Sequence, residues 1–223
     1  MKGLPPLQNL YFPLMLRIHL PIMERGIQGE RFKSNKRKLI VIIEHKEDIS
    51  SNFEGTIVDI ETIGEFDEHY RYTNDSREYQ YMQQVIFGFI NGQGLHILCA
   101  KGMEAISQLK EKTEGILDSL ERPFYAFQSG FERGVLFHQL GKRIDFDGEL
   151  QRYRGESKGN ARTELDILNY GDPFNDVGKL CMQTWLRGEF DRTIAHNRAC
   201  LLKERDILIK RGFRKPDELK FIK

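Results

Sequence analysis

The chain has few of the residues that assign a sequence quickly to a class of protein. Its 223 residues include three cysteines, Cys99, Cys181 and Cys200, and no two of them form a CxxC pair. This spacing excludes a disulfide framework and fits a reducing compartment. The histidines also lack the spacing of metal ligands, so the sequence predicts no zinc site.

Long apolar runs are equally scarce. Residues 4–23 are largely apolar, but four prolines, Arg17 and His19 interrupt them. No run approaches the roughly 20 apolar residues that span a bilayer. We therefore expect a cytoplasmic protein, and the length of the chain favours a single core.

An excess of one charge sign is absent overall but present locally. The net charge is +1, from 34 Lys+Arg and 33 Asp+Glu, which excludes a histone-like protein and an acidic solvating one. Residues 1–38 carry +6 and residues 198–223 carry +5, which leaves −10 for residues 39–197. An acidic middle between basic ends is suited to hold a metal ion near carboxylates and a polyanion at the rim.

Regular structure is predicted from residue 38 onward, after an N-terminal arm over residues 1–37 whose role is open. Short β-branched or apolar runs predict strands over residues 38–44, 55–60, 82–91, 95–100 and 124–127, with a hairpin at residues 91–94. Helical periodicity predicts helices over residues 102–120, 131–140, 174–186 and 190–211, while residues 144–172 are expected to be irregular. This order predicts an α/β or α+β domain over residues 38–223, with a mixed sheet covered by helices.

Two carboxylates, Asp59 and Glu61, lie two residues apart in a run that otherwise consists mainly of Ile and Val. Alternate residues of a strand point to the same face, so both acids would project together from a buried strand. Unpaired buried carboxylates are costly and favour a cation, for which Mg²⁺ or Mn²⁺ is the natural choice. The plain alternative is an incidental pair at a strand end that faces water.

Three segments resemble the motifs of one known group of enzymes. Residues 58–62 (VDIET) resemble the first motif of the DnaQ-like, or DEDD, 3'-to-5' exonucleases. Residues 126–136 resemble their second motif, with Glu132 where the family has Asp. His196, Asn197 and Arg198 match the His-Asn-Arg-x-Asp signature of the YprB-like subgroup, with Cys200 in place of the acid. The resemblance extends over about residues 55–211.

The resemblance implies a ribonuclease-H-like mixed sheet, in which a three-stranded antiparallel meander is followed by parallel strands. It also implies a metal-dependent 3'-5' exonuclease that hydrolyses phosphodiester bonds of single-stranded DNA or RNA ends with two Mg²⁺ or Mn²⁺ ions. Asp59, Glu61 and Glu132 would then be metal ligands and catalytic groups, and His196 would orient or deprotonate the attacking water. An imidazole that is satisfied against the backbone is the alternative for His196.

Cys200 is the main departure from the family pattern, because sulfur is a soft ligand that Mg²⁺ does not favour. Glu204 lies one helical turn further and would supply the missing metal ligand, or else it pairs with a neighbouring Lys or Arg on a solvated face. The alternative function is therefore a catalytically impaired nuclease-fold module that binds nucleic acid or a protein partner. An unrelated α/β protein is the third hypothesis.

Basic and aromatic residues outside these motifs are candidates for contact with nucleic acid. They are Arg31, Lys33, Lys36 and Arg37, the tyrosines Tyr70 and Tyr72, Arg198, and the C-terminal Lys210, Arg211, Arg214 and Lys215. The basic side chains would hold phosphates, and the tyrosines would stack on unpaired bases. A solvated charged face and a loop with inward-packed tyrosines are the ordinary alternatives.

Overall fold

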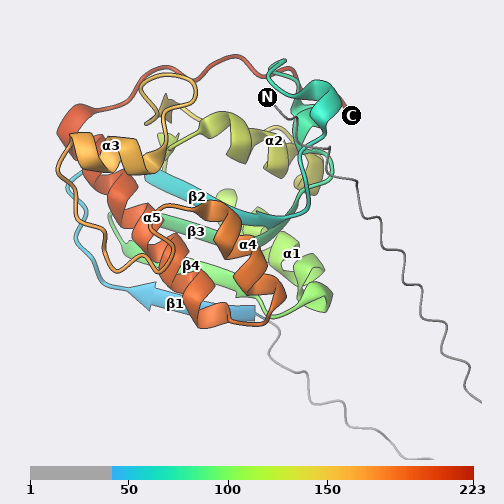
Figure 1. The fold of residues 1–223 in the computed structure, drawn as a ribbon, viewed down its shortest axis with the longest axis horizontal. Coiled ribbons are helices and arrows are strands. Elements are labelled where there is room, and N and C mark those ends of the chain that lie inside the picture. The colour runs from blue at the N-terminus through green and yellow to red at the C-terminus, as the bar shows by residue number, and fades with distance from the viewer. Residues whose placement is uncertain (1–41) are drawn as a thin grey trace, which may run out of the picture. The chain divides into compact units, whose positions relative to one another are not determined.

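A six-stranded mixed sheet lies at the centre of the computed structural model, which describes residues 42–223 (Figure 1). The predicted arm over residues 1–37, with Arg31, Lys33, Lys36 and Arg37, lies outside the described residues. The strands are β1 (Ile42–Glu47), β2 (Thr56–Ile63), β3 (Gln83–Asn91), β4 (Gly94–Ala100), β5 (Phe124–Ala126) and β6 (Gly148–Glu149), in the order β1-β4-β3-β2-β5-β6.

The sheet combines an antiparallel half with a parallel half. Strands β2, β3 and β4 form an antiparallel meander, and β1 extends it antiparallel to β4. On the other side of β2, β5 and β6 continue the sheet in parallel. The predicted α/β class with a mixed sheet is therefore confirmed, and the arrangement is consistent with a ribonuclease-H-like fold.

The sequence of the meander explains why it forms the core. Its strands are rich in β-branched and aromatic residues, and Ile57, Ile86, Phe87, Ile90 and Ile97 are fully buried. A continuous apolar run of this kind is typical of a strand that is covered on both faces. The helices supply this cover.

The helices are α1 (Ile106–Leu117), α2 (Ser129–Leu140), α3 (Lys158–Glu164), α4 (Gly178–Leu186) and α5 (Phe190–Arg211), with short 3₁₀ helices η1 (Glu68–Tyr70), η2 (Ser76–Tyr79) and η3 (Met103–Ala105). Helix α5 lies across β2, β3 and β4 with α4 beside it, and α1 and α2 pack on the other face (Figure 1). None of the helices in residues 42–223 combines the length and the apolar character needed to cross a membrane.

The structure departs from the sequence prediction at three places. The strand predicted over residues 38–44 runs over Ile42–Glu47, and its first four predicted residues lie outside the described chain. The irregular segment predicted over residues 144–172 is wrong, because it contains β6 and α3. Helix α4 begins at Gly178 rather than at residue 174. The Asp172 carboxylate accepts hydrogen bonds from the backbone N–H groups of Phe174 and Asp176, and these bonds hold that stretch in a loop.

Strand β2 separates from β5 soon after the two strands meet. The pairing of β2 with β5 involves only Thr56 and Ile57, whereas β2 pairs with β3 along most of its length. The part of β2 from Val58 onward, which carries Asp59 and Glu61, is therefore not paired with β5. A crevice at a point where strand connections diverge is a common place for a binding site in α/β proteins.

Candidate active site

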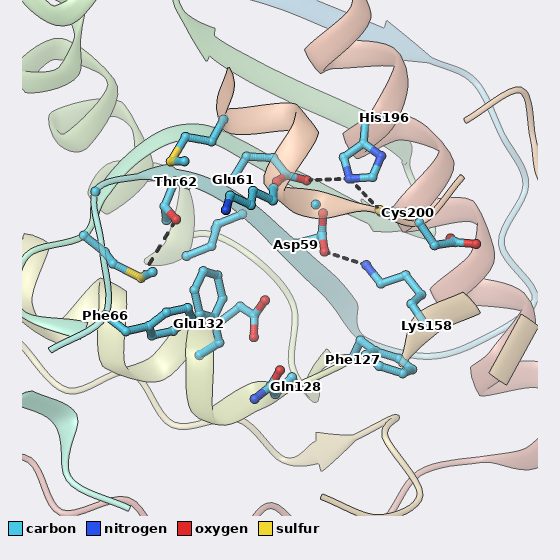
Figure 2. A pocket seen from close by; sticks show the side chains of 18 of the residues that line it. Asp59, Glu61, Thr62, Phe66, Phe127, Gln128, Glu132, Lys158, His196 and Cys200 are labelled. Carbon is cyan, nitrogen blue, oxygen red and sulfur yellow. Dashed lines mark hydrogen bonds and ion pairs between the residues drawn. The ribbon is translucent and has the colours of Figure 1, made fainter. Parts of the chain in front are cut away.

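A cavity of about 600 Å³ opens where β2 separates from β5 (Figure 2). Four residues that the sequence placed in separate motifs line it together, namely Asp59, Glu61, Glu132 and His196. They come from β2, α2 and α5. The rest of the lining includes Phe66, Met82, Phe127, Gln128, Phe131, Lys158, Asp176, Lys179, Met182 and Cys200.

Both carboxylate oxygens of Asp59 accept hydrogen bonds from side chains of the protein. Lys158 Nζ donates to Asp59 Oδ1 over 2.9 Å, and Asn197 Nδ2 donates to Asp59 Oδ2 over 2.6 Å. Asn197 Nδ2 also lies 3.2 Å from the Asp59 carbonyl oxygen. Asp59 is only 6% exposed, so these contacts provide most of its polar surroundings.

The contact between Asn197 and β2 depends on a close approach of α5 to the sheet. Gly88 of β3 lies beneath Asn197, and a Cβ added at Gly88 would lie 2.0 Å from Asn197 Oδ1 and 3.0 Å from Leu201 Cδ1. Such a distance is far inside normal packing, so glycine is required for this helix position. Asn197, which matches the family signature, thus holds Asp59 in its orientation.

The cavity is short of positive charge. Lys158 Nζ lies 2.5 Å from Glu204 Oε1 as well as near Asp59, and Glu204 is fully buried. Glu132 Oε2 and Glu204 Oε2 are buried without a hydrogen-bond partner among the described residues. Glu204 thus does not lie on a solvated face, but its predicted pairing with a lysine is observed, with Lys158 of α3 as the partner.

The pKa values of these groups follow from burial and from their mutual repulsion. Burial, Asp59 and Glu204 raise the pKa of Glu132 well above its usual range. Burial and Asp59 also raise the pKa of Glu204, although Lys158 opposes the shift. Burial alone would lower the pKa of Lys158, but Asp59, Cys200 and Glu204 raise it well above its usual range. The ammonium group of Lys158 thus interacts with the carboxyl groups of Asp59, Glu132 and Glu204, and its single charge cannot neutralise all three. We therefore expect Glu132 and Glu204 to hold protons when no further cation is bound.

A second cluster in the same cavity contains nitrogen and sulfur as well as oxygen. One donor atom from each of Glu61, His196 and Cys200 lies within 4.8 Å of the other two. His196 Nε2 is 3.6 Å from Glu61 Oε1 and 3.7 Å from Cys200 Sγ (Figure 2). All three residues stand in the family motifs, but no pattern predicted a metal site with nitrogen and sulfur ligands, because the three residues lack the spacing of a zinc motif.

The titration of this cluster reflects its burial. Burial and Asp59 raise the pKa of Glu61 to about 7, against the opposing effect of His196. Burial alone would lower the pKa of His196, yet Cys200, Glu61 and Asp172 raise it to about 11. The Cys181 thiol of α4 interacts with the Glu61 carboxyl group and has a pKa raised by burial and by Glu61. A second sulfur therefore lies beside the cluster.

A buried polar network fixes the orientation of His196. Its Nδ1 lies 2.7 Å from Asp172 Oδ1, and Lys203 Nζ donates to Asp172 Oδ2 over 2.6 Å and to Asp176 Oδ1 over 2.5 Å. Lys203 is fully buried. Since Asp172 holds Nδ1, the other ring nitrogen, Nε2, faces Glu61 and Cys200 (Figure 2). The alternative of a histidine satisfied only by the backbone is therefore wrong.

The residues as arranged do not match the pair of Mg²⁺ or Mn²⁺ ions that the family resemblance implies. Lys158 and Asn197 take up both oxygens of Asp59, and Cys200 offers sulfur where a hard ion prefers oxygen. Glu132 Oε2 and Glu204 Oε2, which are buried without a hydrogen-bond partner among the described residues, nevertheless require a cation or a proton. The cavity is therefore suited to cations, but the described residues do not assemble a cluster of three oxygen ligands.

Several predicted nucleic-acid contacts lie away from the cavity. Arg198 pairs with Glu47 of β1 instead of facing the cavity. Tyr70 lies under the Arg77 guanidinium at 4.0 Å, and Tyr72 is 72% exposed. Neither tyrosine lines the cavity. Their contact with nucleic acid stays a prediction.

The C-terminal basic residues are largely neutralised within the protein. Arg211 pairs with Glu156, Arg214 pairs with Glu149 and Asp217, and Lys210 Nζ donates to the carbonyl oxygens of Leu165 and Asp166. The charges of Arg211 and Arg214 are thus paired within the protein, and the contact of these three side chains with phosphates stays a prediction.

The most important residue that the sequence missed is Lys158. It lies in α3, whose sequence is short and polar and shows no apolar periodicity, so no pattern indicated its place in the cavity. Asp172 and Lys203 were missed for another reason, since their contacts with each other and with His196 join residues far apart in the sequence.

Comparisons with protein-family models, with curated proteins and with solved structures found no match for this chain. The likeness to DnaQ-like exonucleases therefore stays a prediction from the three motifs. Function is inferred here from the geometry of the cavity.

Proposed function

We propose that this protein is a cation-dependent nuclease that hydrolyses phosphodiester bonds at an end of DNA or RNA. The observation that carries the proposal is the convergence of Asp59, Glu61, Glu132 and His196 on one cavity. These residues come from three elements and were predicted as parts of three motifs. Acids with perturbed pKa values in a cavity are typical of catalytic sites.

The walls of the cavity support a nucleotide as the bound group. Phe66, Phe127 and Phe131 provide aromatic surface on which unpaired bases can stack. Lys179 is exposed at the cavity and provides an ammonium group that attracts phosphates. A volume of about 600 Å³ lies within the usual range for small-molecule sites, so the cavity suits the end of a strand better than a duplex.

The side chains divide the work at the reacting phosphate. Asn197 and Lys158 hold Asp59 in place, and Asp172 directs His196 Nε2 into the cavity. A bound divalent cation would supply Lewis-acid stabilisation of charge on the phosphoryl oxygens. The positive groups around the acids would hold the substrate phosphate against the repulsion of the carboxylates.

The proposal is tested with end-labelled single-stranded DNA and RNA in the presence of Mg²⁺, Mn²⁺ or Zn²⁺. We expect release of mononucleotides by the wild-type chain and loss of this activity in Asp59→Asn. Asp191→Asn is the matched control, because Asp191 is an exposed acid of the same helix as His196 and does not line the cavity. Absence of cleavage with every metal, or equal cleavage by Asp59→Asn, would contradict the proposal.

A second candidate function is favoured by one observation. Lys158 already pairs with Asp59 and Glu204, so the negative charge of these two acids does not depend on a metal ion for neutralisation. In that case the protein would be an impaired nuclease-fold module that binds nucleic acid or a protein partner. Binding of the same oligonucleotides without cleavage, weakening steeply as salt rises, would support this function over the first.

A further inference from the structure

The cluster of Glu61, His196 and Cys200 has the donors of a transition-metal site. We propose that these three residues bind one thiophilic divalent cation, and that Zn²⁺ is its preferred occupant. The role of the ion in catalysis rests on the proposed nuclease function, but the binding of the ion does not.

The separations of the donor atoms match a zinc site. Zinc bonds of about 2.3 Å to sulfur and about 2.0–2.2 Å to nitrogen or oxygen, at tetrahedral angles, place neighbouring donors about 3.4–3.6 Å apart. The structure has 3.6 Å between His196 Nε2 and Glu61 Oε1, and 3.7 Å between His196 Nε2 and Cys200 Sγ. Two of the three separations are thus close to those of a zinc site before an ion binds, and the third, between Glu61 and Cys200, is within 4.8 Å.

The contact between His196 and Glu61 is not a hydrogen bond. A nitrogen-to-oxygen hydrogen bond is about 2.7–3.2 Å long, so the 3.6 Å contact from His196 to Glu61 is too long for one. The neighbouring contact from His196 Nδ1 to Asp172, by contrast, is 2.7 Å. The histidine therefore forms a close contact with Asp172 on its outer side. On the side of the cluster it has only a 3.6 Å ion pair with Glu61 and a 3.7 Å hydrogen bond with the Cys200 sulfur.

The surroundings of the histidine are those of a metal ligand. A ligating histidine usually gives its other ring N–H to a carboxylate, which fixes the ring and its tautomer. Asp172 fills this position for His196, and Lys203 and two backbone N–H groups hold Asp172 in turn. The side chains of His196, Asp172 and Lys203 are all buried, unlike those of a surface ion pair.

The chemistry of the donors selects the metal. Thiolate and imidazole favour Zn²⁺ over Mg²⁺, which prefers oxygen ligands. The thiol of Cys181 interacts with Glu61 and adds a second sulfur to the surroundings. Three protein ligands leave a fourth position for water or substrate, as in catalytic zinc sites. In this interpretation, Cys200, which replaces the acid of the family motif, changes the preferred metal from Mg²⁺ to Zn²⁺.

The test uses the full chain, freed of metal by a chelator and titrated with Zn²⁺, and with Co²⁺ as a spectroscopic probe. We expect one ion per chain and a sulfur-to-cobalt charge-transfer band. Cys200→Ser should weaken zinc binding by about 100-fold, since loss of an outer partner alone typically costs 10- to 100-fold. Cys99→Ser is the matched control, because Cys99 is a buried cysteine of β4 that does not line the cavity.

A cobalt complex without the sulfur band, or a Cys200→Ser chain that binds zinc less than tenfold more weakly than the wild type, would overturn the proposal. Circular dichroism shows whether each variant is folded. Where Cys200→Ser does not fold, Cys200→Asp replaces it, and we then expect tighter Mn²⁺ binding and weaker zinc binding. Unchanged zinc preference in Cys200→Asp would also overturn the proposal.

Failure of the zinc site and failure of the nuclease function give different results. Cleavage supported by Mg²⁺, with no sulfur-bound cobalt, would refute the zinc site and leave the nuclease function standing. Sulfur-bound cobalt without cleavage under any metal would support the zinc site and count against the nuclease function.

Discussion

Replacement of Lys158 by methionine removes the ammonium that lies between Asp59 and Glu204. The side chain of Lys158 is 15% exposed, and those of the two acids are 8% and 0% exposed. Methionine has a similar length and no charge, so the change isolates the loss of the cation. Removal of one partner of a buried ion pair typically costs about 3–5 kcal/mol, because the remaining charge has no compensation.

The protein has one way to limit this cost, which is to protonate a carboxyl group. For a carboxyl of ordinary pKa near 4, protonation at pH 7 costs about 4 kcal/mol, at about 1.4 kcal/mol for each pH unit. We therefore expect Lys158→Met to lower the free energy of unfolding by about 3–4 kcal/mol at pH 7 and by only about 1–2 kcal/mol at pH 5.

The measurement is denaturant unfolding of the metal-free protein at both pH values. Lys179→Met is the control, because Lys179 lines the same cavity but is exposed and makes no ion pair with the other described residues. We expect its effect to stay within about 0.5 kcal/mol. A loss below about 1 kcal/mol for Lys158→Met at pH 7, or a loss that does not depend on pH, would refute the view that Lys158 neutralises the cavity.

Three further predictions concern other contacts. Gly88→Ala should destabilise the fold by about 1–3 kcal/mol and should weaken cation binding, because the new Cβ displaces Asn197; unfolding and metal titration measure both effects. Glu156→Gln should cost roughly 3 kcal/mol through loss of its buried pair with Arg211, whereas Glu164→Gln, from a half-exposed pair, should cost less than about 1 kcal/mol. Burial alone would raise the pKa of Glu156, but Arg211 lowers it below its usual value, so its contribution is present at neutral pH and is lost as the pH falls through the lowered pKa. The difference in unfolding free energy between wild type and Glu156→Gln should therefore shrink in acid, and a constant difference would contradict the assignment.

The long elements of the fold were predictable from the sequence, because their patterns are strong and local. Helix α5 begins at Phe190 and ends at Arg211 as predicted, since apolar residues recur along it at helical spacing and Gly212 follows it. The meander was predictable from its β-branched runs and from the turn at Asn91 and Gly94. Helix α3 was missed because only Ala161 of its seven residues is buried.

The candidate site was predictable only where its residues belong to motifs. Asp59, Glu61, Glu132 and His196 stand in recognisable patterns, and the structure brings them to one cavity. Lys158 stands in none, because it reaches the site from a polar segment by folding. Pairwise contacts between distant charges leave no local pattern, and the same reason explains why the ion pairs of Arg211 and Arg214 were not predicted.

The charge of the cavity leads to a prediction about the number of ions. Asp59, Glu61, Glu132 and Glu204, together with a metal-bound Cys200 thiolate, total −5 when all are ionised. Lys158 supplies +1 and a single ion at the cluster of Glu61, His196 and Cys200 supplies +2. This leaves −2, and so one proton each for Glu132 and Glu204, whose buried Oε2 atoms have no partner among the described residues.

We therefore expect one tightly bound divalent ion per wild-type chain. In Lys158→Met the missing charge should be replaced by a second ion, because a hard cation such as Mn²⁺ can then reach Asp59 and Glu204. Equilibrium dialysis against Zn²⁺ and Mn²⁺, with elemental analysis of the bound metals, measures both numbers, and Lys179→Met should bind like the wild type. Two tightly bound ions in the wild-type chain would show that Lys158 moves aside for metal and does not replace it.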